Sequence, residues 1–277
     1  PAAPDVAFGV RRVSCQTPVM LVERIAVSAV KGLGLNHPTT VDLTATGVPG
    51  DRRYALVDER GRQVNGKRNG PLVQVRASFT DDPETLTLEL PDGSVVGGVV
   101  EVGEAVTAVF YGKPRPARVV IGDYAEALSQ FAGEPLALIQ LPEGGGIDRV
   151  GDGAVSILST ASLATLGREA GATSPVDDRR FRMTFTVSGV DAHGEDSWIG
   201  RRLRIGGAVI VPQGHVGRCA VTTHDPDTGL PDLDTLKALA HYRGDLDTTE
   251  PLAFGVHARV EVPGRVRVGD EVSLVQP

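Results

Sequence analysis

The chain has 277 residues, 41% of them hydrophobic and 23% charged, which is typical of a globular protein with one large core or two moderate ones. Its 28 basic and 35 acidic residues give a net charge of −7, which argues against a general nucleic-acid binder because a phosphate backbone would be repelled. Apolar runs such as Gly207–Pro212 are much shorter than the ~20 residues that span a bilayer, and no signal segment opens the chain. We therefore expect a cytoplasmic protein without a membrane partner.

The first half of the chain contains the signals of short strands, followed by one helix. Residues 1–19, which include Cys15, have the composition of a loosely ordered leader with an incidental thiol. From Val22 onward, segments such as VERIAVSAV and RRYALVDERGRQV favour strands, and ETLTLELPDGSVV is typical of a hairpin with Asp92-Gly93 at its tip. Closely spaced strands separated by glycine and proline predict a β-barrel-like domain over residues 20–120.

After residue 120 the pattern changes to that of a helix and a glycine-rich connection. GDYAEALSQFAGEP predicts a short helix with Asp123 as its N-cap and Gly133 as part of its stop signal. LPEGGGIDRVGDG indicates a loop, since three consecutive glycines offer no side chains to pack, and it lacks the Lys-Ser/Thr ending of a phosphate-binding P-loop. We expect residues 121–150 to connect two domains.

The remaining segments predict a second domain over residues 151–277. STASLATLGREAG favours a helix opened by a Ser or Thr cap, and Asp234–Tyr242 forms another helical stretch. Strands are expected around FRMTFTVSG, RRLRIGGAVIVP, VHARVEVPG and VRVGDEVSLV. The predicted fold class is mostly β with a few helices.

Cys219 lies in a polar, turn-prone segment, GHVGRCAVTTHDPDTG, which does not resemble a core. Cys15 and Cys219 match no zinc spacing and cannot supply the four thiolates of an iron–sulfur cluster, although a single disulfide between them stays an alternative. The adjacent Arg218 guanidinium stabilises a thiolate over a thiol, which favours a ligand or nucleophile over a structural cysteine. His215 and His224 could transfer protons nearby, or could be solvated surface groups.

A second constellation is basic. It comprises Lys31, Arg52, Arg53, Arg68, Arg179, Arg180 and Arg182. Guanidinium groups from distant segments could converge on a phosphate, to which their planar forks bind in a bidentate manner. The alternative is that each forms an exposed salt bridge, which contributes little. Sequence spacing does not decide between the two.

Several motifs in a fixed order carry a resemblance over residues 22–275. They are VERIAVSAVKGLGL, GVPGDRRYALVDERGRQVNGKRNGPLV, ILSTASLATL, RRFRMTFTVSG, EDSWIGRRLRIG, GRCAVTTHDPDTG and FGVHARVEVPGRVRVGDEV. In this order they resemble the MOSC family with its N-terminal β-barrel domain, and within it the type of the mitochondrial amidoxime-reducing component and its bacterial relatives. The resemblance implies an N-terminal β-barrel domain followed by a MOSC β-barrel domain that holds molybdenum cofactor (molybdopterin).

The same resemblance implies roles for individual residues. Cys219 would be the protein ligand to molybdenum, and the cofactor's phosphate and pterin would be held by Lys31, Arg52, Arg182 and Arg218. Ser159 and Ser162 match positions near the cofactor, with helix capping as the alternative, while Glu195, Asp196 and Trp198 shape the site or pack. The chain departs from the family pattern at Gly32, where a serine is usual, and at Thr184, where an asparagine is usual.

The function implied is the reduction of N-hydroxylated small molecules such as amidoximes, hydroxylamines or hydroxylated bases, with two electrons and two protons consumed and water released. Because no cysteine-rich ferredoxin segment follows in this chain, we expect a separate ferredoxin-, flavodoxin- or reductase-like electron donor. Two alternatives remain open. One is a sulfur carrier or sulfurtransferase with a persulfide on Cys219, and the other is a non-catalytic module that binds or delivers the cofactor.

Overall fold

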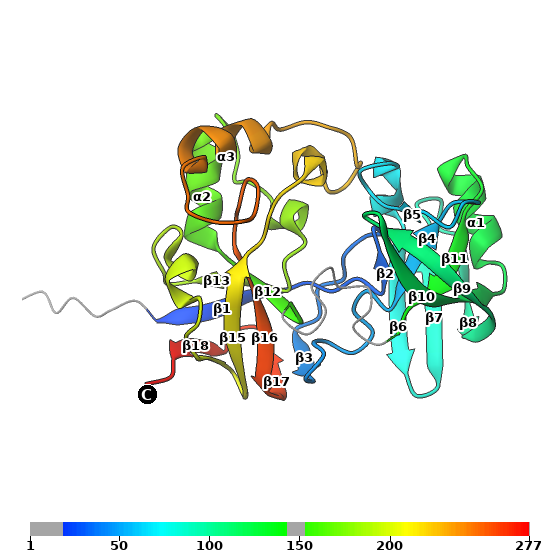
Figure 1. The fold of residues 1–277 in the computed structure, drawn as a ribbon, viewed down its shortest axis with the longest axis horizontal. Coiled ribbons are helices and arrows are strands. Elements are labelled where there is room, and N and C mark those ends of the chain that lie inside the picture. The colour runs from blue at the N-terminus through cyan, green and yellow to red at the C-terminus, as the bar shows by residue number, and fades with distance from the viewer. Residues whose placement is uncertain (1–18, 143–152, 277) are drawn as a thin grey trace, which may run out of the picture.

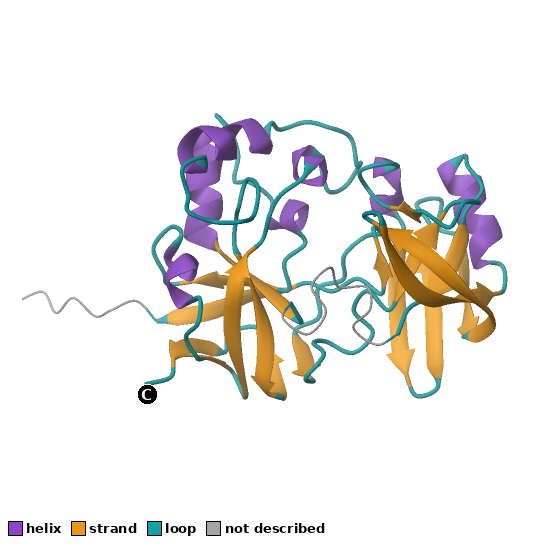
Figure 2. Ribbon diagram, in the orientation of Figure 1, coloured by secondary structure: helices purple, strands orange, loops and turns teal. Residues whose placement is uncertain are grey.

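The computed structural model describes residues 19–142 and 153–276. Most of the predicted leader, Cys15, and residues 143–150 of the predicted connection lie outside the described residues. The mostly β class is confirmed. Figures 1 and 2 show two groups of strands side by side, with most of the short helices along the upper side of the view.

One group of strands closes into a seven-stranded barrel in the order β1-β13-β12-β16-β15-β14-β18. Its strands are β1 (Met20–Ile25), β12 (Val155–Ser159), β13 (Phe185–Ser188), β14 (Leu203–Ile205), β15 (Ala208–His215), β16 (Val256–Val262) and β18 (Glu271–Leu274). β12 and β13 are parallel, while the other pairs are antiparallel. Fully buried side chains such as Ile25, Ile157 and Phe185 fill the barrel, because side chains alternate between the two faces of each strand.

Two strands from the start of the chain belong to this C-terminal part of the molecule. β1 joins β13, with Ile25 opposite Phe185, and also joins β18, with Met20 opposite Val272. β3 (Thr40–Leu43) pairs with β17 (Gly264–Arg267). The domain limits at residues 20–120 and 151–277 stay a prediction. β1 and β3 fall within the first of these ranges, yet they pair with strands of the second.

The second group of strands forms the N-terminal part. One sheet has the order β2-β4-β11-β10-β9, with β5 paired to β4, and the other has the order β6-β7-β8. The strands are β2 (Val30–Lys31), β4 (Tyr54–Val57), β5 (Gln63–Val64), β6 (Arg76–Asp81), β7 (Glu84–Glu89), β8 (Val95–Val99), β9 (Glu101–Phe110), β10 (Lys113–Ile121) and β11 (Ala137–Gln140). The predicted hairpin at Asp92-Gly93 is confirmed, since β7 and β8 are antiparallel and Gly93 has a φ of 84° that suits glycine in a tight turn.

The predicted helices are also present. They are α1 (Tyr124–Ala132), α2 (Thr160–Glu169) and α3 (Thr235–Arg243). α1 ends at Gly133 in the left-handed conformation, as predicted, although the Asp123 side chain makes no capping bond. Leu166, Leu239 and Phe254 share one buried cluster, so α2 and α3 cover one end of the barrel (Figure 1).

Short 3-10 helices connect several strands: η1 (Gly70–Gln74), η2 (Asp178–Phe181), η3 (Gly194–Trp198) and η4 (Ala220–Thr223). The predicted strand around FRMTFTVSG is therefore shorter than expected, because Arg182 follows η2 in a left-handed conformation and the ladder starts only at Phe185. None of the helices within residues 19–142 and 153–276 is both long enough and apolar enough to cross a membrane.

Candidate cofactor site

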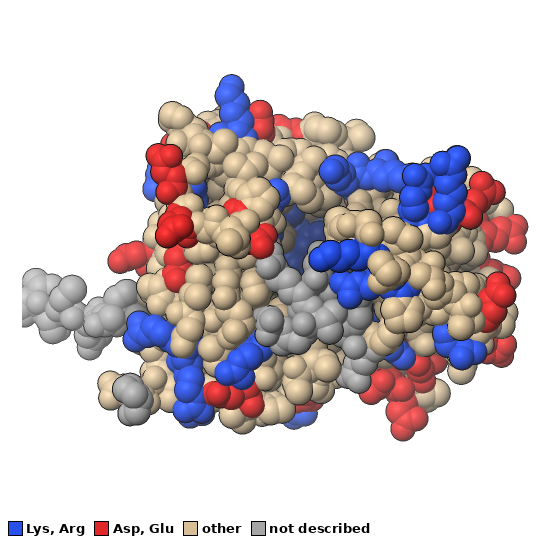
Figure 3. Space-filling view, viewed as in Figure 1, with Lys and Arg blue, Asp and Glu red and all other residues tan. Residues whose placement is uncertain are grey.

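A cavity of about 340 Å³ lies between the two groups of strands. Its walls come from β2 and the loops at residues 52 and 65–70 on one side, and from η2, η4 and the segment between β15 and η4 on the other. Figure 3 shows Lys and Arg side chains at the bottom of a hollow in this region. The size is close to the lower end of the range for small-molecule sites.

The lining of this cavity is strongly cationic. Among the described residues that line the cavity, seven side chains are cationic and one, that of Asp225, is a carboxylate. The seven are Lys31, Arg52, Lys67, Arg179, Arg180, Arg182 and Arg218. Predicted basic residues from distant segments therefore do converge, and the cavity suits an anionic ligand.

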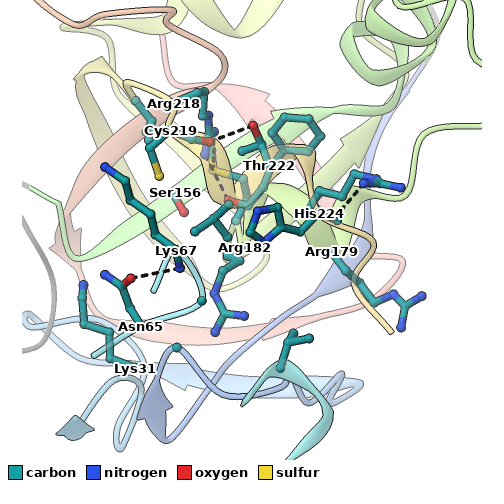
Figure 4. Close-up of a pocket in the computed structure, with 18 of the residues that line it drawn as sticks. Lys31, Asn65, Lys67, Ser156, Arg179, Arg182, Arg218, Cys219, Thr222 and His224 are labelled. Atoms are coloured by element: carbon teal, nitrogen blue, oxygen red, sulfur yellow. Dashed lines mark hydrogen bonds between the residues drawn. The ribbon is translucent and has the colours of Figure 1, made fainter. Parts of the chain in front are cut away.

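Cys219 lines the cavity and is exposed, so the alternative of a buried structural thiol is wrong. It occupies the N-cap position of η4, and its carbonyl accepts hydrogen bonds from the Thr222 backbone N–H at 3.0 Å and from the Thr222 hydroxyl at 3.1 Å. These bonds fix the backbone and leave the sulfur directed into open space (Figure 4). The geometry presents a thiol to a ligand in the cavity.

Hydrogen bonds of the Arg218 guanidinium go to backbone carbonyls remote in the sequence, although Cys219 follows Arg218 directly. Its guanidinium is buried and donates hydrogen bonds to the Phe254 carbonyl at 2.8 Å and to the Phe181 carbonyl at 3.0 Å, and it lies 5.3 Å from the centre of the Phe181 ring. Burial lowers the pKa of Arg218 to about 9, opposed by the neighbouring Cys219. Arg218 thus ties the segment before Cys219 to two other loops.

Arg182 and Arg52 meet across the boundary between the two groups of strands. The Arg182 guanidinium donates to the Leu33 carbonyl at 2.7 Å, and its own carbonyl accepts a hydrogen bond from Arg52 at 2.9 Å. Arg52 pairs with Asp51, whereas Arg182 pairs with no carboxylate among the described residues. Burial, assisted by the charge of Arg52, lowers the pKa of Arg182 to about 10, so this cation lacks a counter-ion that an anionic ligand would supply.

Lys31 is 9% exposed and lines the cavity from β2. Lys67, which sequence reasoning missed, is exposed and extends toward Cys219 in Figure 4, and its backbone N–H donates to the Asn65 side chain at 3.0 Å. Nothing local distinguishes this lysine within NGKRNG from its neighbour Arg68.

Besides Arg52, four of the predicted arginines form ion pairs instead of remaining free for a ligand. Arg53 pairs with Glu84 at 3.5 Å. Arg68 pairs with Asp58 and Glu134, each at 2.6 Å. Arg179 pairs with Asp177 and Asp227, each at 2.6 Å, and Arg180 pairs with Asp232 at 2.5 Å. For these residues the salt-bridge alternative describes the structure, even though Arg179 and Arg180 also line the cavity.

Thr184 is 2% exposed and forms part of the cavity wall together with Ser156, which the sequence analysis did not single out. The Thr184 hydroxyl accepts from the Ser156 backbone N–H at 3.1 Å, and the Ser156 hydroxyl accepts from the Thr184 backbone N–H at 3.0 Å. The other departure, Gly32, has a φ of 99°, and a Cβ there would lie 3.1 Å from the Asn65 backbone. Glycine relieves both constraints.

Ser159 and Ser162 are fully buried and do not belong to the cavity lining. The Ser159 hydroxyl accepts from the Ser162 backbone N–H at 3.1 Å as the N-cap of α2, and the Ser162 hydroxyl donates to Glu195 at 2.7 Å. Burial raises the pKa of Glu195. The structure therefore supports the capping alternative for this serine pair and brings neither serine to the cavity.

Of the remaining candidate residues, some line the cavity and others pack or form ion pairs away from it. Trp198 packs in the barrel core, and Asp196 pairs with Arg243 at 2.9 Å. His215 lies 3.4 Å from Asp196 and outside the cavity lining, whereas His224 lines it. Within the part of the chain that the structure describes, no three His, Cys, Asp or Glu side chains are grouped as metal ligands.

Residues 119–273 match the MOSC domain, and residues 19–131 match the MOSC N-terminal beta barrel domain. Mitochondrial amidoxime-reducing component 1 of Homo sapiens is 38% identical over 127 residues, which are 43% of this chain and 36% of that protein. The protein of the same name from Xenopus laevis is 26% identical over 259 residues, 81% of this chain and 72% of that protein. Among solved structures, the YUAD protein from Bacillus subtilis is 12% identical with a TM-score of 0.43, over 92% of this chain and 94% of that one. The match to the human protein thus spans about a third of its length.

Proposed function

Because the chain belongs to the MOSC domain family, we propose that it binds molybdenum cofactor with Cys219 as the protein ligand to the metal and reduces N-hydroxylated compounds. The names of its relatives, amidoxime-reducing components, support this substrate class. The chemistry is the removal of oxygen from an N–O group, in which two electrons and two protons are consumed and water is released.

The observation that carries the proposal is the exposed Cys219 thiol at the wall of a cationic cavity. A thiolate is a soft ligand and suits a metal that is already held by the two sulfurs of a pterin dithiolene. The pterin's phosphate is anionic, and Arg182 is a cation without a carboxylate partner among the described residues. Donor type and charge both fit the cofactor.

The cations have separate tasks in this proposal. Lys31, Arg52 and Arg182 contact the phosphate and the polar edge of the pterin, and two of them come from the N-terminal part of the chain. Arg218 acts as a positioning residue, since its guanidinium is bonded to the Phe254 and Phe181 carbonyls and holds the loop that carries Cys219. When bound, the cofactor supplies the redox chemistry that amino-acid side chains lack.

Other lining residues shape the space around the substrate. Ser156 and Thr184 satisfy each other's polar groups, so this wall presents few unpaired donors or acceptors. We assign the delivery of a proton to the substrate oxygen to two of the lining groups, Lys67 and His224, Lys67 from its exposed position beside Cys219 (Figure 4). Electrons would come from a separate ferredoxin-, flavodoxin- or reductase-like protein, and a cytoplasmic location stays a prediction.

The proposal is tested with protein made in a host that synthesises the cofactor. We expect molybdenum and pterin in equal amounts, and turnover of a simple aryl amidoxime with a chemical reductant. A persulfide on Cys219 without molybdenum would contradict the proposal in favour of sulfur transfer. Molybdenum and pterin without turnover of any amidoxime, hydroxylamine or hydroxylated base would contradict the catalytic part and favour a delivery module.

A further inference from the structure

An exposed basic surface borders the cavity on the N-terminal part of the molecule. Its cations are Arg60, Arg62, Lys67, Arg68 and Lys113, and all five residues are exposed. The first two lie between β4 and β5, the next two follow β5, and the last begins β10. Figure 3 shows Lys and Arg side chains gathered beside the hollow on this group of strands.

Backbone pairing brings the two segments of the basic surface next to each other. Val109 of β9 forms a bridge with Arg62, and its backbone N–H donates to the Gly61 carbonyl at 2.8 Å. β9 also pairs along its length with β10, which starts at Lys113. The turn between β4 and β5 and the hairpin of β9 and β10 therefore form one continuous surface.

Carboxylates compensate only part of the charge of the basic surface. Asp58 pairs with Arg62 at 3.3 Å and with Arg68 at 2.6 Å, and Glu134 pairs with Arg68 at 2.6 Å. Glu59 is exposed in the same turn. Within residues 19–142 and 153–276, the side chains of the other three cations form no ion pair. The basic surface is thus positive in a chain whose net charge is −7, so it attracts and orients an acidic partner.

Lys67 and Tyr111 join the basic surface to the cavity, since both are exposed and both line the cavity together with Cys219. Tyr111 is 67% exposed at the tip of the hairpin, with a φ of 51°, and Gly112 follows with a φ of 78°. Such a two-residue turn favours asparagine and glycine, so backbone preference does not favour a tyrosine there. Protein interfaces, in contrast, are enriched in tyrosine and arginine.

From this juxtaposition we infer that the basic surface is the docking site of a small acidic electron-carrier protein of the ferredoxin or flavodoxin class. The inference rests on the proposed function and names the surface at which the electron donor binds. Electron transfer slows steeply with distance, and a carrier docked on the basic surface covers Lys67 and Tyr111, which line the same cavity as Cys219. The carrier therefore lies close to the metal that Cys219 would bind.

The stoichiometry of the reaction favours a weak interface made by charges. Each N–O bond that breaks consumes two electrons and two protons, and yields the reduced nitrogen compound and water. A carrier that gives one electron must dock twice in each turnover, so two reduced carriers are oxidised for each substrate molecule. Repeated docking requires rapid association and release, which electrostatic attraction provides and a large apolar interface does not.

The test variant is the double charge reversal Arg60→Glu/Lys113→Glu. Both residues are exposed and neither lines the cavity. The matched control is Arg201→Glu/Arg204→Glu, which changes the net charge equally at two exposed arginines outside the cavity lining, at β14 in the other group of strands. Protein from a host that synthesises the cofactor is titrated in a calorimeter with an acidic plant-type ferredoxin and with an acidic flavodoxin. Turnover of an aryl amidoxime is measured with each reduced carrier and with a chemical reductant.

The inference predicts that wild type and control bind one of the two carriers equally well at low salt, whereas Arg60→Glu/Lys113→Glu binds it about tenfold more weakly. The KM for that carrier should rise by the same factor, and added salt should reduce the difference because it screens the charges. Turnover with the chemical reductant should be equal in all three proteins.

The two readouts separate failure of the inference from failure of the proposed function. Equal carrier affinity and equal KM in the two variants, or no binding of either carrier by the wild type, would overturn the inference and leave turnover with the chemical reductant as support for the proposed function. Carrier binding that is weakened only in Arg60→Glu/Lys113→Glu, without turnover by any reductant, would support the docking site and overturn the proposed function. Absence of both binding and turnover would overturn both.

Discussion

At the scale of single residues, the account depends on which arginines are already neutralised. Arg68, Arg179 and Arg180 have carboxylate partners, while Arg182 has only the Leu33 carbonyl. Sequence patterns show that a cation is present but not whether a distant aspartate neutralises it, because the pairing is made by the fold. The sequence analysis missed Lys67 and Ser156 for a related reason, since the fold and not the local sequence brings them to the cavity wall.

The first prediction concerns Arg182→Gln. The amide can still donate to the Leu33 carbonyl, so the loop should keep its shape, but the charge for the cofactor phosphate is lost. A charge-assisted hydrogen bond contributes about 1.5–3 kcal/mol, so cofactor affinity should fall at least tenfold. Molybdenum content after dialysis measures the loss. The control is Arg204→Gln, which replaces an exposed arginine on β14 outside the cavity lining. Equal molybdenum content in the two proteins would show that Arg182 does not contact the cofactor.

The second prediction concerns Thr184→Asn, which restores the residue usual in the family pattern. The amide oxygen can replace the hydroxyl as acceptor for the Ser156 backbone N–H, and the amide donors then become available to the cofactor. One additional hydrogen bond contributes about 1 kcal/mol, so cofactor loss during dialysis should slow about fivefold. Thr184→Val, which leaves the Ser156 N–H unpaired, should lose cofactor faster. Faster loss from the asparagine variant would argue against this position as a cofactor contact.

At the scale of elements, the sequence analysis correctly predicted turns and helix ends whose conformation is determined by neighbouring residues. The hairpin at Asp92-Gly93 and the end of α1 at Gly133 follow from backbone conformations that glycine favours, and both were found where the sequence placed them. The strand predicted from Phe181 failed at its first residues, because the left-handed Arg182 interrupts it and is held by contacts with Leu33 and Arg52 that are remote in sequence.

The third prediction follows from the N-cap of α2. Ser159→Ala removes the acceptor for the Ser162 backbone N–H and should lower the free energy of unfolding by about 1 kcal/mol. Cofactor content should stay that of the wild type, because Ser159 does not line the cavity. Urea unfolding and molybdenum analysis measure the two quantities. Unchanged stability together with lost molybdenum would reinstate Ser159 as a cofactor ligand.

The fourth prediction concerns His193, at the start of η3. Its ring lies 5.6 Å from Tyr242 and 5.9 Å from Phe254, centre to centre, and its ring nitrogens have no hydrogen-bond partner among the described residues. Burial lowers the pKa of His193 from 6.5 to about 4. Between these values the unfolded chain binds the proton and the folded chain does not, so stability is fully present above pH 6.5 and is lost as the pH falls toward 4.

This linkage amounts to at most about 3 kcal/mol, since one pKa unit corresponds to 1.36 kcal/mol and the ring is only partly buried. His193→Asn keeps a residue that tolerates the left-handed φ of 62° but removes the titration. Urea unfolding at pH 7 and pH 4.5 should therefore show a smaller decrease for the variant than for the wild type. Equal decreases would exclude His193 as the source of the pH dependence.

At the scale of the whole molecule, the barrel closes only because the start of the chain returns to its end. β1 lies between β13 and β18, and the sequence contains no signal for this pairing, since a strand's neighbours are set by long-range packing. The order of the motifs nevertheless predicted the family. The motif residues Lys31, Arg52, Arg182 and Cys219, which are far apart in the sequence, line one cavity. The cavity needs both parts of the chain, and neither part alone contains Cys219 together with Lys31.

The measurement that tests the central claim most directly is the molybdenum X-ray absorption spectrum of loaded wild-type protein and of Cys219→Ser. The side chain is exposed, so the variant should keep the wild-type fold and thermal unfolding, and Cys15→Ser provides a thiol control. The account predicts one sulfur neighbour fewer around molybdenum in Cys219→Ser, an oxygen in its place, and loss of amidoxime reduction, because oxygen is a harder ligand than sulfur. Identical spectra and wild-type turnover in Cys219→Ser would contradict it.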